Sequence, residues 1–347
     1  MRKLRTIAAI ALPVVLLAAC GSDTDTADTV ADTATSDVAV ADTAVDGGAR
    51  ATSYPLTIEN CGFTSTLEAP PERILVSYDV ADPLVLWGLS DNIVGWHTYQ
   101  PLTRYPGLQE QLDQLEVEPE PFAREAIVAL KPDLVISASS GVFTPEYGMT
   151  REDLAEIGAA SWVPESLCAQ DYSDATDAQL KDLSARNFGD VLSEMLALGE
   201  IVDRQAEAQD LVDVLSTEMA LLEDAVEGRE PVQTAVFSYY AGELGGVYVG
   251  GVAEDYIVRA GGVNPHRDPE AQFKSLSVEE LTVTPLDVVL VDSADEGVSE
   301  AVLDLFPTWP AADNGRAAFI PGMFSSISAP YVVRDLIEVL HPDVELP

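Results

Sequence analysis

Aromatic and basic side chains follow most of the β-strands predicted for this sequence. Strands are expected at 73–77, 92–96, 134–137, 160–163, 234–238 and 247–249. In open α/β sheets ligands bind beyond the carboxyl ends of the strands, so residues near those ends are candidates for ligand contacts. The candidates are Tyr78, Trp96, His97, Tyr99, Arg104, Ser139, Trp162, Tyr239, Tyr248, Arg267 and Lys274. Rings with a polar edge suit a flat or propeller-shaped metal chelate.

The elements that would position these residues alternate between helices and strands in two halves of the chain. Two similar stretches, EAIVALKPDLVISASSG from Glu125 and EELTVTPLDVVLVDSAD from Glu279, each lead from a short helix through a proline turn to an apolar strand. Such uninterrupted apolar runs suit parallel strands covered by helices. The recurrence predicts two α/β lobes, each with a central, mainly parallel sheet.

One long helix is predicted between the lobes, from Glu200 to Glu227. Its apolar residues recur three, four or seven positions apart and form one stripe: Ala208, Leu211, Leu215, Met219, Leu222 and Val226. At a rise of about 1.5 Å per residue the helix would be about 40 Å long, enough to run along both lobes. We therefore expect an N-terminal lobe, a rigid spanning helix and a C-terminal lobe at 51–199, 200–228 and 229–347.

The N-terminus carries the pattern of a secretory signal. Basic residues precede an apolar run from Ile7 to Leu17, and small residues stand directly before Cys20. This order resembles the lipobox of bacterial lipoproteins, which implies a signal peptide at 1–20 and a lipid on Cys20. Because the apolar run is shorter than the roughly 20 residues of a membrane span, attachment is expected through the lipid only, on the outer face of the cytoplasmic membrane. A non-lipidated signal with a chance cysteine stays open.

The stretch at 21–50 consists almost wholly of Asp, Thr, Ala, Val, Ser and Gly. It cannot bury enough apolar surface to fold, so we expect a disordered acidic tether. The formal net charge of the whole chain is -41, which argues against nucleic acid or an anionic membrane surface as a partner. An acidic proteome in a salt-exposed organism would give the same composition.

Two cysteines remain after the predicted signal, Cys61 and Cys168. Disulfides persist in exported proteins, so a single bridge is the natural pairing. It would close a long loop, for which the chain-entropy model gives about 4 to 5 kcal/mol. Metal ligation by two isolated cysteines without CxxC spacing is the weaker alternative.

The order of four features resembles the iron-siderophore, haem and cobalamin substrate-binding proteins of ABC importers, over the whole mature chain. The features are Pro71-Glu72-Arg73-Ile74 before the first strand, Glu125 with Lys131-Pro132-Asp133-Leu134-Val135-Ile136, the single long helix, and Ser277-Val278-Glu279-Glu280-Leu281 before Pro285. The resemblance implies two α/β lobes joined by one rigid helix, with the ligand in the cleft between them. We expect a monomeric, extracytoplasmic binding protein that is not an enzyme and has no cofactor.

The resemblance also implies a function for several residues. In this family one exposed glutamate on each lobe docks on arginines of the permease, and the matching residues are Glu125 and Glu279. Helix N-terminal carboxylates that complement the helix dipole are the alternative for both. Basic residues in such sites neutralise anionic ferric catecholates or haem propionates. Because the candidate site has only Arg104, Arg267 and Lys274, a weakly charged hydroxamate or mixed-type siderophore is favoured over a triscatecholate.

Three competing functions remain. Haem binding would need an axial tyrosine or histidine, for which Tyr78, His97 and His266 are available, and cobalamin is a further ligand of the family. Direct capture of Zn²⁺ or Mn²⁺ is disfavoured because the chain has three histidines. A secreted hydrolase is disfavoured because no GxSxG, HExxH or GxxxxGK[ST] motif occurs.

Overall fold

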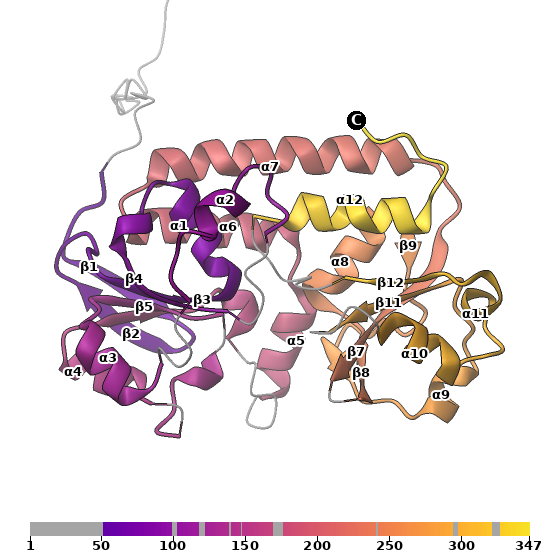
Figure 1. The fold of residues 1–347 in the computed structure, drawn as a ribbon, viewed down its shortest axis with the longest axis horizontal. Helices are drawn as coiled ribbons and strands as arrows, with labels where there is room; N and C mark the ends of the chain where they lie inside the picture. Colours follow the sequence, from indigo (N-terminus) through magenta and orange to yellow (C-terminus); the bar gives the residue numbers. More distant parts are fainter. Residues whose placement is uncertain are drawn as a thin grey trace, which may run out of the picture. The chain divides into compact units, whose positions relative to one another are not determined.

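The structure is a computed structural model. It describes residues 51–98, 103–117, 122–138, 140–146, 148–168, 176–240, 242–293, 298–320 and 327–347. The predicted signal peptide with Cys20, the predicted tether, and the candidate ligand residues Tyr99 and Ser139 lie outside the described residues. The described residues form two α/β lobes within one compact unit (Figure 1), which confirms the predicted fold class.

Lobe one is built on a four-stranded parallel sheet. In spatial order its strands are β4 (Ile93–His97), β3 (Ile74–Ser77), β5 (Leu134–Ile136) and β6 (Ala160–Trp162). Strands β3, β5 and β6 are buried along their whole length, as parallel strands covered on both faces must be.

Short helices connect the strands of lobe one. The α-helices are α1 (Ala81–Leu86), α2 (Gln109–Leu112), α3 (Arg124–Leu130) and α4 (Arg151–Glu156). The 3₁₀ turns are η1 (Tyr78–Val80), η2 (Ser90–Asn92), η3 (Ser140–Val142) and η4 (Glu165–Leu167). Helix α1 ends shortly before Gly88, which takes a φ of 75°, and the Leu89 amide then donates to the Leu84 carbonyl at 2.9 Å.

A β-hairpin covers the outer edge of β6 with side chains. Its antiparallel strands are β1 (Leu56–Asn60) and β2 (Phe63–Leu67). Asn60 Nδ2 donates to the Val163 carbonyl at 2.8 Å, and Asn60 Oδ1 accepts from the Val163 amide at 2.9 Å. Ser65 Oγ lies 3.5 Å from both the amide nitrogen and the carbonyl oxygen of Ser161. Backbone groups at the edge that could template another strand are thereby occupied.

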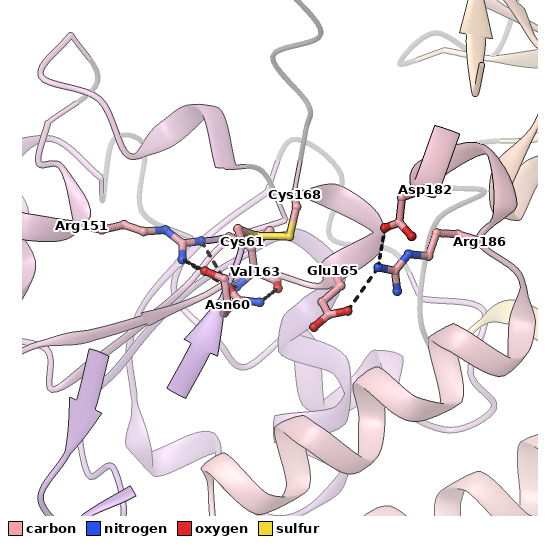
Figure 2. The surroundings of a disulfide bond; sticks show 8 residues. All are labelled: Asn60, Cys61, Arg151, Val163, Glu165, Cys168, Asp182 and Arg186. Atoms are coloured by element: carbon pink, nitrogen blue, oxygen red, sulfur yellow. Dashed lines mark hydrogen bonds and ion pairs between the residues drawn. A yellow bond between two sulfur atoms is a disulfide. The ribbon is translucent and has the colours of Figure 1, made fainter. Parts of the chain in front are cut away.

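A disulfide and a buried arginine fix the hairpin to the rest of lobe one (Figure 2). Cys61 and Cys168 are bonded, which confirms their predicted pairing. Arg151 of α4 is 8% exposed, and its Nη1 donates to the Asn60 carbonyl at 2.8 Å. The guanidinium also lies 4.9 Å from the centroid of the Phe143 ring. Burial lowers the pKa of Arg151 to about 10, so the group remains charged at neutral pH.

Three helices lead from lobe one to lobe two: α5 (Asp177–Ala185), α6 (Phe188–Ile201) and α7 (Gln205–Val226). The predicted apolar stripe is buried on α7, but the predicted start at Glu200 is wrong, since Glu200 belongs to α6. The chain turns between α6 and α7 at Asp203, whose φ is 56°. Gly199 allows the turn to close, because a Cβ there would lie 2.4 Å from the Ala208 Cβ. No helix in the described part of the chain is long and apolar enough to cross a membrane.

Lobe two is built on a six-stranded mixed sheet. In spatial order its strands are β10 (Phe273–Lys274), β8 (Glu243–Tyr248), β7 (Val232–Tyr240), β11 (Val288–Asp292) and β12 (Ala317–Phe319), with β9 (Gly262–Val263) paired to β7. Strand β8 runs antiparallel to both of its neighbours, β7 and β10, and the other pairs are parallel. The helices are α8 (Gly251–Arg259), α9 (Val278–Thr282), α10 (Val298–Leu305), α11 (Pro310–Asn314) and α12 (Ala329–Leu340), of which α10 and α11 were not predicted.

One hydrophobic core includes residues of both lobes and of α7. Leu134 of β5 and Leu290 of β11 point into it, as do the buried residues of α7. The alternate residues of each strand point to the opposite face, where Val135 joins a small cluster in lobe one and Val289 joins a larger one in lobe two. The shared core is what connects the lobes through α7.

Candidate functional site

A pair of rings lies at the carboxyl edge of the lobe-one sheet. Tyr78 follows β3 and His97 ends β4, and their ring centroids are 5.8 Å apart with an interplanar angle of 77°. Both residues are half-buried. The φ of Tyr78 is 52°, in the left-handed region that bulky residues rarely adopt. Strained residues of this kind cluster at functional sites, so Tyr78 and His97 are the strongest described candidates in lobe one.

Two serines support the same edge. Ser77 Oγ lies 3.3 Å from Ser137 Oγ and accepts a hydrogen bond from the Ala138 amide at 2.8 Å. These bonds satisfy buried polar groups where β3 and β5 end. They also fix the start of the loop that leads to Ser140, which is half-buried.

Two of the predicted rings lie in the core. Trp96 is 2% exposed and Trp162 is 3% exposed, and both pack in the shared core. Side chains alternate along a strand, so His97 at the end of β4 points away from the face that buries Trp96. The indole Nε1 of Trp96 donates to the Tyr78 carbonyl at 2.8 Å. This hydrogen bond from the buried Trp96 therefore stabilises the strained backbone of Tyr78.

In lobe two a tyrosine and a carboxylate meet at the end of a central strand. The Tyr248 hydroxyl donates to Asp292 Oδ2 at 2.9 Å, and the Phe273 ring packs edge-on against Tyr248 at 5.2 Å between centroids. Asp292 is the last residue of β11 and is 7% exposed. The sequence analysis missed Asp292, although a polar residue that ends an apolar parallel strand meets the criterion that selected Tyr78.

Tyr239 lies near the end of β7, at the same edge of the lobe-two sheet. It is half-buried, and its ring packs against the second hydrophobic cluster of this lobe. Its hydroxyl donates to the Gly242 carbonyl at 2.9 Å. The structure thus places Tyr239 and Tyr248 on neighbouring antiparallel strands.

The three predicted basic residues are each paired with a carboxylate. The pairs are Arg104 Nε with Asp335 Oδ2 at 2.8 Å, Arg267 Nε with Glu254 Oε1 at 3.7 Å, and Lys274 Nζ with Asp268 Oδ2. A hydrogen bond from Lys274 holds the pKa of the Asp268 carboxyl below its usual range. Each of the three positive charges that were predicted to contact a ligand is therefore paired with a carboxylate of the protein itself.

The segment around Arg104 also joins lobe one to α12. The Arg104 amide donates to Ser328 Oγ at 3.3 Å, and the Tyr105 ring meets the Tyr331 ring edge-on at 5.7 Å. Ser328 is 2% exposed and precedes α12. Arg104 thus holds distant parts of the chain together, which its sequence neighbourhood did not indicate.

Burial changes the titration of two groups near Arg267. Burial raises the pKa of the Glu254 carboxyl and lowers the pKa of His266. Among the residues that the structure describes, Glu254 Oε2 and His266 Nε2 have no hydrogen-bond partner. His266 is thereby favoured in its neutral form. Among the described residues, no group of three or more His, Cys, Asp or Glu side chains is placed to hold a metal ion.

The two predicted docking glutamates occupy the same position in two helices. Glu125 is the second residue of α3, and Glu279 is the second residue of α9. Both side chains are exposed. Each helix precedes a buried parallel strand, β5 in lobe one and β11 in lobe two.

A family model described as periplasmic binding protein matches residues 74–322. The chain belongs to the periplasmic binding protein family. The match begins at β3 and extends beyond β12, so it includes both sheets and α7 of this binding protein. It confirms the resemblance stated from the sequence. A search of curated proteins found no match.

Solved structures share the fold of this binding protein. It is similar to a periplasmic binding protein from Veillonella parvula, with a TM-score of 0.68 at 14% identity over 83% of this chain and 97% of that chain. It is also similar to an ABC-type Fe3+-hydroxamate transport system from Saccharomonospora viridis, with a TM-score of 0.64 at 25% identity over 82% and 98%. A periplasmic heme binding protein from Pseudomonas aeruginosa gives 0.61 at 18% identity over 80% and 95%.

Proposed function

We propose that this binding protein captures a ferric siderophore complex outside the cytoplasm and delivers it to an ABC importer permease. The proposed ligand contacts are Tyr78 and His97 at the carboxyl edge of the lobe-one sheet, and Tyr239 and Tyr248 in lobe two. Tyr239 lies near the carboxyl end of β7, and the Tyr248 hydroxyl reaches Asp292 at the carboxyl end of β11. Tyr99 and Ser139 remain proposed contacts from the sequence. The similarity to the Fe3+-hydroxamate transport system supports an iron chelate as the ligand.

The observation that carries the delivery step is the equivalent placement of Glu125 and Glu279. Each is the exposed second residue of the helix in the repeated unit of helix, proline turn, aspartate and buried strand, one in each lobe, and Glu152 does not belong to such a unit. A helix-dipole function would need no such correspondence between lobes. One permease that contacts both lobes would need it, so we assign both carboxylates to docking.

The membrane attachment in this proposal is a lipid on Cys20. The acidic stretch at 21–50 then serves as a tether between the membrane and the two lobes, which lie on either side of α7. In this proposal the binding protein docks on the permease as a monomer. If a Cys20→Ser substitution releases the protein from membranes, lipidation of Cys20 is supported. Unchanged membrane retention would contradict it.

A ligand panel tests the capture step. The purified protein is titrated with ferric hydroxamates, ferric catecholates, ferric citrate, haem and cobalamin while the Trp and Tyr fluorescence is followed. We expect saturable, stoichiometric quenching by a ferric siderophore and no turnover. The absence of a response to every compound would contradict the proposed function.

Charge reversal tests the docking step. The double variant Glu125→Lys with Glu279→Lys should keep its ligand affinity and lose uptake in cells. Glu152→Lys is a matched control, because Glu152 is the exposed second residue of α4. The control should transport normally. Loss of ligand binding in the double variant, or equal loss of uptake in the control, would refute docking.

Haem is the second candidate ligand, because Tyr78 and His97 lie together at the edge of lobe one. Either side chain could serve as an axial ligand to haem iron. Haem binding would give a Soret band when haem is added to the protein, and the band should disappear in the Tyr78→Phe and His97→Ala double variant. This result would favour haem over a siderophore as the ligand.

A further inference from the structure

We infer that α5 couples the Cys61–Cys168 disulfide of lobe one to the proposed ligand contact Tyr248 of lobe two, so that breaking this connection weakens ligand binding. The inference rests on the proposed function, because it takes Tyr248 as a ligand contact. It follows from a continuous series of contacts, the α5 path, that runs from the disulfide through Arg186 and Ser184 to the Tyr248 ring. Arg186 and Ser184 are assigned as positioning residues.

The disulfide fixes the end of a short turn in lobe one. Cys168 directly follows η4, and its amide donates to the Glu165 carbonyl at 3.2 Å. The bond to Cys61 joins this turn to the tip of the hairpin of β1 and β2. The backbone of Glu165 is therefore positioned by a covalent bond as well as by hydrogen bonds.

Arg186 joins this turn to α5 (Figure 2). It directly follows α5, and its side chain is 17% exposed. Its Nη2 donates to Glu165 Oε2 at 3.2 Å and to Asp182 Oδ2 at 2.9 Å. Its Nη1 lies 3.9 Å from Asp190 Oδ1 of α6. Because the guanidinium is mostly buried, water screens these pairs less than pairs on the surface. Arg186 therefore links α5 to the turn that the disulfide fixes.

The last turn of α5 contacts lobe two. Ser184 Oγ lies 2.6 Å from the Pro269 carbonyl oxygen and 2.8 Å from the Lys181 carbonyl oxygen, so its one hydroxyl hydrogen is shared between them. A Cβ at Gly250 would lie 3.1 Å from the Ser184 Cβ and 2.5 Å from the Ala271 carbonyl oxygen. The close packing of α5 against this part of lobe two thus depends on a glycine.

The lobe-two segment that α5 contacts leads directly to Tyr248. The Gln272 carbonyl accepts from the Val249 amide at 2.8 Å and from the Gly250 amide at 3.3 Å. The next residue, Phe273, pairs with Tyr248 across β10 and β8, and the two rings meet edge-on at 5.2 Å between centroids. A displacement of α5 would therefore reach the Tyr248 ring through backbone hydrogen bonds and one aromatic contact.

Two substitutions break the α5 path while changing few contacts. Glu165→Gln removes the pair with Arg186 and leaves Arg186 its two other carboxylates, and Ser184→Ala removes the hydrogen bond to lobe two. Each should lower the affinity for a ferric trihydroxamate about threefold to tenfold, measured by Trp and Tyr fluorescence. The double variant should lose less than the product of the two single effects, because the two contacts act in series.

Removal of the disulfide tests the start of the path. Cys61→Ser with Cys168→Ser should lower the affinity by at least as much as Glu165→Gln. In all of these variants, hydrogen exchange measured without ligand should be faster at the Val249 and Gly250 amides, because these amides donate to the segment that α5 holds. Thermal unfolding verifies that each variant is folded. If the cysteine variant does not fold, Glu165→Gln and Ser184→Ala still test the inference.

Two control variants change similar contacts elsewhere in lobe one. Arg124→Met breaks an ion pair of similar length, from Arg124 Nη1 to Asp153 Oδ2 at 3.3 Å, which joins α3 to α4. Phe122→Ala lowers the stability of lobe one through its small hydrophobic cluster. Both controls should keep the wild-type affinity and the wild-type exchange at Val249 and Gly250.

The outcomes separate the inference from the proposed function. Wild-type affinity and exchange in Glu165→Gln and Ser184→Ala, or equal losses of affinity in the controls, would overturn the inference and leave siderophore capture intact. No binding of any ferric chelate would overturn the proposed function and, with it, the assignment of Tyr248 as a ligand contact on which the inference rests.

Discussion

The helix–turn–strand unit of lobe one and that of lobe two share one hydrogen-bonding scheme. In lobe one the Asp133 amide donates to the Arg73 carbonyl at 3.0 Å, and Asp133 Oδ1 accepts from the Arg73 amide at 3.0 Å. In lobe two the Asp287 amide donates to the Gln233 carbonyl at 2.9 Å, and Asp287 Oδ2 accepts from the Gln233 amide at 3.3 Å. The aspartate after each proline turn thus links the unit to the start of the neighbouring strand.

The helices of the two units are stabilised differently. Helix α9 begins with a capping box, in which Ser277 Oγ accepts from the Glu280 amide and the Glu280 carboxylate accepts from the Ser277 amide. Helix α3 follows Ala123, which provides no side-chain cap. The turn and the strand thus keep the same hydrogen bonds in both lobes, while the caps of the two helices differ.

The hydrophobic clusters that pack on β5 in lobe one and on β11 in lobe two give the largest expected difference in stability between the lobes. Trp309 stacks on Phe306 at 3.9 Å between centroids, and both are fully buried in the lobe-two cluster. Trp309→Ala should cost about 3 to 5 kcal/mol in the free energy of unfolding. Phe122→Ala in the smaller lobe-one cluster should cost less, because Phe122 is 9% exposed. Urea unfolding of both variants measures the two losses of unfolding free energy. A larger loss for Phe122→Ala than for Trp309→Ala would contradict this prediction.

The turn aspartates should differ in the same measurement. Among the described residues, the Asp133 side chain accepts hydrogen bonds from two amides, Glu72 at 2.8 Å and Arg73, whereas the Asp287 side chain accepts from one. Asp133→Ala should therefore cost about 2 to 3 kcal/mol and Asp287→Ala about 1 kcal/mol. Asparagine at either position keeps an acceptor and should cost less than alanine. Equal losses for the two alanine variants would show that the second amide contributes nothing.

The helix caps should give the smallest effects, with opposite signs. Ser277→Ala should destabilise the protein by about 1 kcal/mol, while Ala123→Ser should stabilise it by up to about 1 kcal/mol, because it supplies the missing cap. Circular dichroism melting at neutral pH measures both changes.

The cap of α9 should also depend on pH. Hydrogen bonds from the Ser277 amide and hydroxyl lower the pKa of the Glu280 carboxyl below its usual range. A carboxyl with a lowered folded-state pKa stabilises the fold above its unfolded pKa and loses this contribution as the pH falls through the folded pKa. The effect of Ser277→Ala should therefore shrink in acid, and a constant effect from neutral pH to acid would exclude a contribution from the Glu280 charge.

Local patterns in the sequence predicted much of the fold and part of the candidate site. The strands β3, β5 and β11, the apolar stripe of α7 and the Cys61–Cys168 pairing were all predicted. The start of α7 was not predicted correctly, because the apolar periodicity continues across the turn at Asp203. Helices α5, α6, α10 and α11 were also missed.

The sequence by itself determined the central strands, the two lobes and the family, because periodicity and turn residues act within a few positions of one another. Only the tertiary structure decided which side chains of the candidate site face outward. It buried Trp96 and left His97 half-buried, and it paired Arg104 with Asp335, which is 231 residues away in the chain. Ion pairs and burial depend on which distant segments meet in space, and no local pattern of residues encodes that meeting.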